Sequence, residues 1–585
     1  MDTDSTHSST PHKVKELATS RPRVLGWLRS AAILDGDWGT SVAYVMGIGF
    51  ALAGYASYWH LVAMMLLTTL IAFNYITICR LYPNGGGVYS SVYHRSHLLG
   101  VIGALLLSAD YIVTMSLSVL DACHYLNVSN PPLAAALIII GIGILNWYGP
   151  KHSGGLALVI SFFTLLVLAT IIGFSFHTGI TQAHIERPTG GFFHNWSIFT
   201  GFVLSLSGVE AISNMTGLMR DPARDSRRTI FVVLTKVVIA NLCLGLALLA
   251  IPGLHPGEHL EDMLRFLGEH YVGNWFGWVV ALSLGVLLIS AGNTALNGLI
   301  SIQFLMALDR ELPTSLRRLN RYGVPIIPLI IATLAPILVI MFIRDVETMS
   351  HLYAIGVVSA ITINLGSTAT DPDVSLKPSV KYFTTASAII MFLIAISIAI
   401  NKHEATIFVL IILAVGLTAR YVAQRKIVAQ PIPAEIQAAE PQPTKKRRRI
   451  SIPSAKFLVA IKGMNERLLK FAIEEAKQRG ALLFILHVKE IAVGTLPERL
   501  EIQTNGFEDK IEKACLDAGI DFQIISIPSY DVGYTIAEQA ATFGVDRVIL
   551  GATKRSVLEN MLRGNVIRTL SALLPEDVQL IIFGG

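Results

Sequence analysis

Long apolar segments fill most of the first 422 residues of this sequence. Each is about as long as the ~20 residues that an α-helix needs to cross a lipid bilayer. Only 15% of all residues are charged, whereas soluble domains average roughly 25%. We therefore predict a polytopic α-helical membrane domain over residues 31–423 with twelve spans, preceded by a tail at 1–30. The spans are expected near 33–55, 60–79, 98–121, 132–149, 154–177, 195–218, 229–252, 273–306, 324–343, 349–368, 382–400 and 405–422.

The loops between these segments differ in charge. Basic residues collect after the second, sixth and eighth segments, while the loop after the seventh is acidic. Because positive residues are retained on the cytoplasmic side, and an even number of spans puts both ends on one side, we expect both termini of this cell-membrane protein in the cytoplasm. The net charge of +5 then reflects loop topology, and no nucleic-acid partner is expected. The basic residues are Arg80, Arg95, Arg220, Arg224, Arg227, Arg228, Arg310, Arg317, Arg318 and Arg321, and the acidic ones are Glu258, Glu261, Asp262 and Glu269.

The first segment opens with polar residues rather than with leucine or valine. Two carboxylates, two glycines and two hydroxyls lie within residues 35–41. A charge in the middle of a span costs at least roughly 2.5–3.5 kcal/mol, so it is retained for a reason. The oxygen atoms in this stretch suit a small hard cation, and they belong to Asp37, Thr40, Ser41 and Tyr44. An alternative is that Asp35 and Asp37 cap a helix N-terminus at the cytoplasmic surface, and for Asp35 this is the interpretation that we favour.

The third segment carries a polar stripe. Four polar residues follow one another at spacings of four, four and three residues, so they share one face of a helix. Such a face turns toward protein or water and not toward lipid. The alternative is structural, with the hydroxyls bonded to helix carbonyls and the first carboxylate in an ion pair. The four residues are Asp110, Thr114, Ser118 and Asp121.

The sixth segment is interrupted in the same way as the first. Small and polar residues replace aliphatic ones over 205–214, and they include Ser207, Gly208 and Glu210. Broken helices at matching places in two halves point to a transporter site at the middle of the membrane. Tyr353 in the tenth segment is a further candidate, although a lone tyrosine near the end of a span is more often an interfacial anchor.

The C-terminal part has the pattern of a soluble domain. A linker at 424–454, rich in Pro, Ala and Gln and ending in a basic run, separates it from the spans. Residues 455–585 then alternate apolar runs with helical patterns, which predicts a doubly wound α/β domain with five parallel strands. The strands are expected at 457–461, 482–488, 522–527, 547–551 and 578–583, and the helices at 466–478, 506–518, 533–543 and 566–574.

These features together resemble a known family. The turn at Tyr82–Tyr89, the twelve spans and the two interrupted segments look like the amino acid–polyamine–organocation superfamily over roughly residues 30–422. The resemblance implies a LeuT-like fold of two five-helix repeats in inverted orientation. Within the superfamily, Gly36-Asp37-Trp38-Gly39-Thr40-Ser41 resembles the Gly-Asp-x-Gly-Thr-Ser motif of the KUP potassium transporters, and spans one, three, six and ten resemble the KimA-type potassium importers. Ser207 stands where we expect Thr, and residues 293–298 lack the usual ending of span eight.

The resemblance implies secondary active potassium uptake, coupled to protons by alternating access, without a cofactor. Potassium would be bound as the substrate by oxygen atoms that replace its hydration shell. Burial favours the neutral form of a carboxyl group, which lets such a group carry a proton. No nucleophile–base or metal constellation suggests an enzyme. The potassium ligands are expected to be Asp37, Tyr44, Asp110, Tyr111, Thr114, Ser118, Ser207 and Tyr353, and the proton carriers Asp37, Asp110 and Glu210.

The C-terminal domain resembles the universal stress proteins. Gly551-Ala552-Thr553-Lys554 and Gly564-Asn565 are similar to the signature Gly-x2-Gly-x9-Gly-Ser/Thr, whose loop holds phosphate at a helix N-terminus. The resemblance implies a regulatory nucleotide, such as ATP, AMP or cyclic di-AMP, and a homodimer formed through this domain. A nucleotide-free dimerisation domain is the alternative, because Lys554, Asn565 and Lys462 depart from the pattern of ATP-binding members. The implied nucleotide ligands are Gly551, Lys554, Gly564 and Asn565.

Two other functions remain open at the level of the sequence. A proton-coupled amino-acid or polyamine permease would have the same fold, but such carriers usually hold a substrate carboxylate in a glycine-rich break that is missing here. A non-transporting nutrient sensor would explain the C-terminal domain, but it gives no reason for three carboxylates inside spans.

Overall fold

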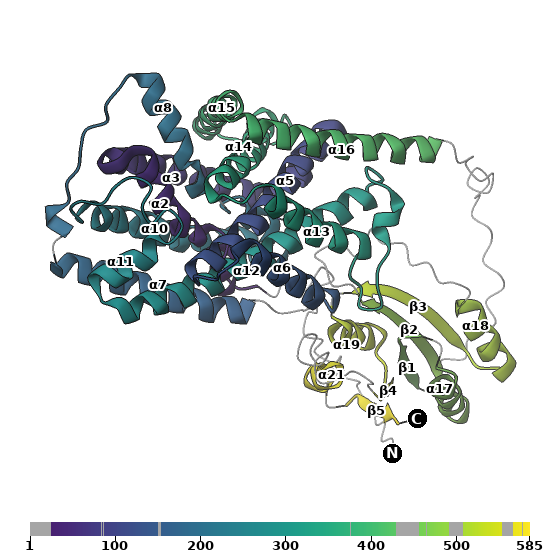
Figure 1. Cartoon of the computed structure of the whole chain (residues 1–585). Coiled ribbons are helices and arrows are strands. Elements are labelled where there is room, and N and C mark those ends of the chain that lie inside the picture. The colour runs from purple at the N-terminus through teal and green to yellow at the C-terminus, as the bar shows by residue number, and fades with distance from the viewer. Residues whose placement is uncertain are drawn as a thin grey trace, which may run out of the picture. The chain divides into compact units, whose positions relative to one another are not determined.

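The computed structural model describes residues 25–428, except 84, 86, 150–153, 179, 207 and 375, and residues 455–584, except 464, 491–506, 530, 553–564 and 576. The chain forms two compact units (Figure 1). One is helical and the other is built around a β-sheet.

The helical unit consists of α-helices joined by loops and short 3-10 turns. Each of the twelve predicted apolar segments overlaps one or more of these helices. Their bounds are α1 (Trp27–Asp35), η1 (Trp38–Thr40), α2 (Ser41–Ala53), η2 (Gly54–Ala56), α3 (Ser57–Leu81), α4 (Val88–Tyr93), α5 (His97–Tyr125), α6 (Pro131–Trp147), α7 (Gly154–Thr178), η3 (Ile180–Gln182), α8 (Phe192–Gly201), η4 (Phe202–Leu206), α9 (Ala211–Met215), η5 (Thr216–Leu218), α10 (Pro222–Leu249), α11 (Met263–Tyr271), α12 (Asn274–Leu308), η6 (Thr314–Arg317), α13 (Ile326–Phe342), α14 (Val346–Thr370), α15 (Pro378–Asn401) and α16 (His403–Val428).

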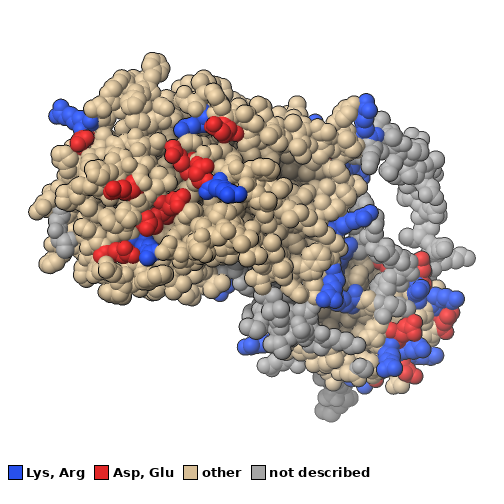
Figure 2. Space-filling model, in the orientation of Figure 1, with Lys and Arg blue, Asp and Glu red and all other residues tan. Residues whose placement is uncertain are grey.

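Nine helical stretches among the described residues are long and apolar enough to cross a membrane. The first, Trp38–Leu81, contains both α2 and α3, and α6 and α13 are shorter apolar helices of 17 residues each. These stretches and the two short helices hold all twelve predicted spans. Large apolar side chains lie on the outside, such as Leu66 and Phe342, which are 68% and 85% exposed. Figure 2 shows broad surface areas of the helical unit without charged side chains, as contact with lipid requires. The chain is therefore a multi-pass membrane protein.

The first and sixth spans are interrupted, as the sequence predicts. In the first span, α1 ends at Asp35 and α2 begins only at Ser41, with the short turn η1 between them. In the sixth span, α8 gives way to η4 and then to a turn at 208–210 before α9 begins. Gly208 in that turn has φ = +84°, a conformation that glycine adopts at no steric cost.

The second unit confirms the predicted α/β domain. Its five strands are all parallel and lie in the order β3-β2-β1-β4-β5. The strands are β1 (Lys456–Ile461), β2 (Leu482–Glu490), β3 (Phe522–Ser529), β4 (Arg547–Gly551) and β5 (Gln579–Phe583), and the described helices are α17 (Glu466–Arg479), α18 (Phe507–Ala518), α19 (Val532–Phe543) and α21 (Val566–Leu573).

Helices cover both faces of this sheet (Figure 1). Alternate residues of β1 point to opposite faces: Phe457 and Val459 pack with α17 and α18, whereas Leu458 packs with α19 and α21. Both faces of the sheet are therefore apolar, which explains why its strands appear in the sequence as continuous apolar runs.

Candidate functional site

Helix α5 turns its polar stripe toward the interior of the helical unit. Asp110 and Thr114 are 1% and 5% exposed, and Ser118 and Asp121 are 1% and 0% exposed. Thr114 Oγ1 lies 2.9 Å from the Asp110 carbonyl oxygen and 3.2 Å from Asp110 Oδ1. Asp110 and Thr114 therefore form one polar pair on the buried face of α5.

The interruptions of the first and sixth spans pack against each other. A Cβ atom on Gly208 would lie 2.6 Å from Trp38 N and 2.9 Å from Asp37 Cγ, so only glycine allows the two backbones to approach this closely. Trp38 Nε1 also donates a hydrogen bond to the Ser205 carbonyl oxygen at 3.3 Å. Asp37 and Glu210 are 4% and 5% exposed. Each interruption thus contributes one buried carboxylate to the same region.

Helix α14 approaches α5 through a glycine. A Cβ atom on Gly356 would lie 3.1 Å from Asp110 N and 3.2 Å from Asp110 Cα. Tyr353, one turn earlier on α14, is close enough to Asp110 and Glu210 to interact with them electrostatically. It is only 1% exposed, which does not fit a tyrosine that anchors a helix at the membrane surface.

Three carboxylates meet in this region. Asp110 lies within electrostatic range of both Glu210 and Asp37, and Glu210 within range of Asp37. Over the part of the helical unit that the structure describes, none of the three forms an ion pair with a Lys, Arg or His side chain. Glu210 Oε2 is buried and has no hydrogen-bond partner among the described residues. Like charges that are desolvated together repel one another strongly, so this arrangement favours a bound cation or proton.

Two tyrosines complete the polar lining. The Tyr44 hydroxyl lies 3.3 Å from Thr40 Oγ1 on the same helical stretch. The Tyr111 hydroxyl accepts a hydrogen bond from Asn214 Nδ2 at 2.8 Å. The Tyr111 ring packs against Gly298, where an added Cβ atom would lie only 2.7 Å from the ring. The stretch of span eight that departs from the family pattern therefore supports Tyr111.

The structure brings most of the predicted site residues together. Ser118 lies one helical turn beyond Thr114 on α5. Ser207 lies outside the described residues. The residues that gather around the two interruptions are Asp37, Tyr44, Asp110, Tyr111, Thr114, Glu210 and Tyr353.

Sequence reasoning missed Tyr75 on α3. It is 1% exposed, lies within electrostatic range of Glu210 and Asp110, and its hydroxyl pairs with the side chain of Asn364. The signal in the sequence was the polar pair Asn74-Tyr75 in the middle of an otherwise apolar span.

The prediction that Asp35 caps a helix at the membrane surface is wrong. Asp35 is the last residue of α1 and is 2% exposed. Both of its carboxylate oxygens lie 2.6 Å from Lys236 Nζ on α10, and Ser161 Oγ donates to Oδ2 at 2.5 Å. Asp37 has no capping hydrogen bond either. The ammonium group of Lys236, and not the N-terminus of a helix, compensates the negative charge of Asp35.

Two known protein families match parts of the sequence. Residues 25–417 match the family model described as "Amino acid permease". The chain belongs to the amino acid permease family. Residues 455–581 match the "Universal stress protein family" model. The protein is therefore a membrane transporter with a C-terminal universal stress protein domain.

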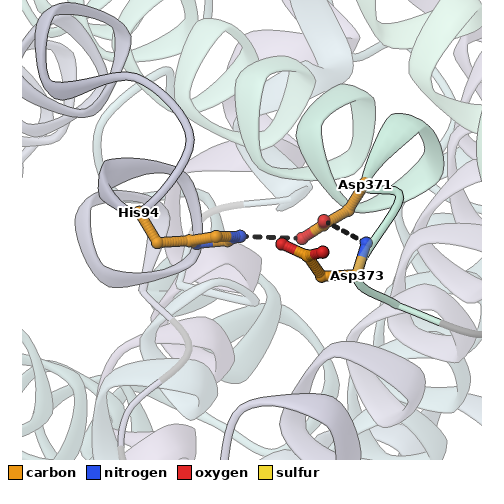
Figure 3. Close-up of side chains that lie close together, drawn as sticks. All are labelled: His94, Asp371 and Asp373. Atoms are coloured by element: carbon orange, nitrogen blue, oxygen red, sulfur yellow. Dashed lines mark hydrogen bonds and ion pairs between the residues drawn. The ribbon is translucent and has the colours of Figure 1, made fainter.

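A second polar cluster in the permease domain lies apart from the interrupted spans. Figure 3 shows the carboxylates of Asp371 and Asp373 side by side, facing the ring of His94, and the ligand atoms of the three residues lie within 4.8 Å of one another. Asp371 Oδ2 lies 3.0 Å from His94 Nε2, and Oδ1 accepts a hydrogen bond from Asp373 N at 3.0 Å. Because these bonds engage both carboxylate oxygens, we interpret the cluster as a tie between the end of α4 and the end of α14, and we assign no metal ion to it.

In the universal stress protein domain, the order of the strands reverses at the β1–β4 pair. The carboxyl ends of such a pair form the crevice where doubly wound sheets bind ligands. Gly551 ends β4 there, and a Cβ atom on it would lie 3.8 Å from Asn465 Nδ2. Asn565 Oδ1 accepts hydrogen bonds from Ile567 N at 3.0 Å and from Arg568 N at 3.2 Å, so Asn565 caps α21. The predicted ligands Lys554 and Gly564 lie outside the described residues.

Proposed function

We propose that this permease imports potassium together with protons by alternating access. The observation that carries the proposal is the meeting of Asp37, Asp110 and Glu210 at the contact of two interrupted spans, without a basic partner among the described residues. Three desolvated carboxylates favour a positively charged substrate and disfavour a substrate that carries its own carboxylate.

The surrounding side chains suit a small cation. Hydroxyl groups of Tyr44, Thr114 and Tyr353 lie in the same buried region as the carboxylates. Neutral oxygens of this kind replace the hydration shell of potassium, and their number and field strength set selectivity. All three residues are at most 5% exposed, which fits an occluded state of alternating access.

The same cluster supports the proposed proton coupling. A proton on one carboxylate and a potassium ion at the other two together reduce the negative charge of the cluster, so the occupancy of one position changes the binding at the other. Asp37, Asp110 and Glu210 are the candidate proton carriers.

The second candidate function is a proton-coupled amino-acid or polyamine permease. The family match over residues 25–417 favours it. A polyamine or another cationic substrate would also pair with buried carboxylates. This candidate predicts uptake of a radiolabelled amino acid or polyamine that potassium does not inhibit.

Uptake into proteoliposomes distinguishes the two functions. The purified full-length chain is reconstituted, and potassium uptake is measured with and without an inward proton gradient, next to uptake of amino acids and polyamines. Potassium uptake that follows the gradient is expected, and Asp110→Asn should abolish it. Asp373→Asn removes an exposed carboxylate of the same domain and should leave uptake unchanged. Near-normal uptake by Asp110→Asn would reject the assignment of Asp110.

We also propose that both termini face the cytoplasm, that the universal stress protein domain mediates a homodimer and that it binds a regulatory nucleotide. The charge of the loops supports the orientation, and the reversal of the strand order between β1 and β4 supports the ligand site. Protease digestion of the C-terminal domain in inside-out vesicles tests the orientation. Light scattering of the full chain in detergent tests the dimer, and calorimetric titration with ATP, AMP and cyclic di-AMP tests the ligand.

A further inference from the structure

One buried carboxylate of α5 has no role in the site described so far. Asp121 is 0% exposed, and neither of its carboxylate oxygens has a hydrogen-bond partner among the described residues. A buried charge is stable only when a cation or hydrogen-bond donors compensate it. Asp121 therefore fits a positively charged ligand.

The hydroxyl one turn before Asp121 shares this property. Three other hydroxyls on α5 each bond to the carbonyl oxygen four residues earlier, at 2.7–2.9 Å. Ser118 Oγ does not, and within the described part of the domain this buried atom has no partner at all. Residues at i and i+3 lie on the same face of a helix. The Ser118 hydroxyl and the two Asp121 oxygens are therefore three unpartnered oxygen atoms on one buried face. The three bonded hydroxyls belong to Ser108, Thr114 and Ser116.

The surroundings of Asp121 are acidic. Glu261 and Asp262, which precede α11, are close enough for their charges to act on Asp121. The basic groups nearby have other partners: His124 pairs with Glu261 at 2.5 Å, and Arg265 pairs with an acidic residue of its own helix at 2.9 Å. Negative potential at this end of α5 raises the local concentration of cations.

We propose that Asp121 and Ser118 form a second cation-binding position, which holds a potassium ion at the acidic end of α5 before it reaches Asp110. This inference rests on the proposed function and moves Ser118 from the first position to the second. With a rise of about 1.5 Å per residue, Asp121 lies about 16 Å along α5 from Asp110, and Ser118 about 6 Å from Thr114. The polar stripe then provides two successive positions on one helix face. Under the proposed topology, the second position is the outer one.

The test uses the full-length chain in detergent and in proteoliposomes. Calorimetric titration with potassium chloride gives the number of ions bound per chain, and initial rates at increasing potassium concentration give half-saturation and maximal rate. Asp121→Asn keeps the shape of the side chain and removes its charge. Ser118→Ala removes the second ligand. Ser108→Ala is the matched control, because the Ser108 hydroxyl bonds, among the described residues, only to a carbonyl of its own helix.

Asp121→Asn should bind one potassium ion fewer than the wild-type chain and require about tenfold more potassium for half-maximal uptake, which corresponds to the loss of one charged contact. Its maximal rate should be retained, because the Asp110 site is intact. Ser118→Ala should shift half-saturation in the same direction by a smaller factor, and Ser108→Ala should not shift it.

Any of four outcomes would overturn the second position. Wild-type binding and half-saturation in Asp121→Asn would remove it and leave the proposed function intact. Loss of the proton dependence of uptake, with potassium affinity unchanged, would make Asp121 a proton carrier instead. Absence of potassium binding to the wild-type chain would reject both proposals at once. If Asp121→Asn does not yield folded protein, Ser118→Ala decides, and an unchanged half-saturation in that variant overturns the position.

Discussion

Lys236 and Asp35 form a buried ion pair between the first interrupted span and α10. Lys236 Nζ lies 2.6 Å from each Asp35 carboxylate oxygen, and the two side chains are 12% and 3% exposed. The pair is joined by Ser161 of α7. Three helices are thus fixed two residues before Asp37, so the pair positions the start of the candidate substrate site.

Replacing Lys236 by Met should strongly destabilise the protein. The substitution leaves Asp35 buried without a cation, and breaking a buried pair in this way costs about 3–5 kcal/mol. The additional change Asp35→Asn should recover much of the loss, since no uncompensated charge remains. Thermal unfolding of the detergent-solubilised variants measures both effects. A double variant whose loss of stability equals the sum of the losses of Lys236→Met and Asp35→Asn would show that the pair carries no coupling energy.

Replacing Gly208 by Ala should abolish transport. The new Cβ atom would lie 2.6 Å from Trp38 N, and the residue would have to keep φ = +84°, which costs about 1–3 kcal/mol in a non-glycine residue. The two interruptions must then separate, which moves Asp37 away from Glu210. Uptake into proteoliposomes measures the loss.

Gly366→Ala on α14 is the matched control for that experiment. No heavy atom lies within 4 Å of the Cβ position at Gly366, so alanine there should leave uptake unchanged and stabilise the helix by about 0.5–1 kcal/mol. Equal losses of uptake in both variants would contradict the proposed contact between the interruptions.

Replacing Glu311 by Ala should destabilise the permease domain by about 3 kcal/mol, because it leaves the partly buried Arg420 without its anion. Glu311 is 3% exposed. Its Oε2 accepts hydrogen bonds from Arg420 Nε at 2.5 Å and from Gln424 Nε2 at 3.3 Å, and its Oε1 accepts one from the Tyr93 hydroxyl at 3.1 Å. Thermal unfolding measures the effect. Glu347→Ala, which removes an exposed carboxylate at the start of α14, should change stability by no more than about 0.5 kcal/mol.

Much of the fold was predictable because it depends on local patterns of apolar and polar side chains along the sequence. The apolar segments, the parallel strands and the stripe from Asp110 to Asp121 each follow from the spacing of side chains along one helix or strand. The interruptions at Asp37 and Gly208 were also predictable, since small and polar residues weaken a helix where they replace aliphatic ones. A transporter site at these two interruptions was expected from their matching places in two halves of the chain, and their close contact at Gly208 came only from the structure.

Pairings between distant residues could not be predicted. Lys236 lies 201 residues from Asp35 in the sequence, and no periodicity relates them. The sequence alone therefore favoured a helix cap for Asp35, which is the commonest role of an aspartate at the start of a helix. Tyr75 was missed for a similar reason: the pair Asn74-Tyr75 is a polar signal, but it does not reveal which distant residues its face of the span meets.

The stability of the universal stress protein domain should decrease as the pH falls below about 6.5. Burial lowers the pKa of His487 below its ordinary value of 6.5, and the charge of Lys489 acts in the same direction. The unfolded chain therefore binds a proton more readily than the folded domain does, and lowering the pH through this range favours unfolding. Glu538 has the opposite dependence, because burial raises its pKa above 4.5 and its protonation favours the folded state.

Hydrogen exchange of the β1 and β2 amides in the full chain, corrected for intrinsic exchange rates, measures this dependence. Protection should be lower at pH 5.5 than at pH 7.5, about one unit on either side of the ordinary histidine value. His487 is the only histidine in residues 455–585, so His487→Gln should remove the decrease and leave the opposite contribution of Glu538. A decrease that persists in His487→Gln would show that another group titrates, and that burial of His487 does not control the pH response of the domain.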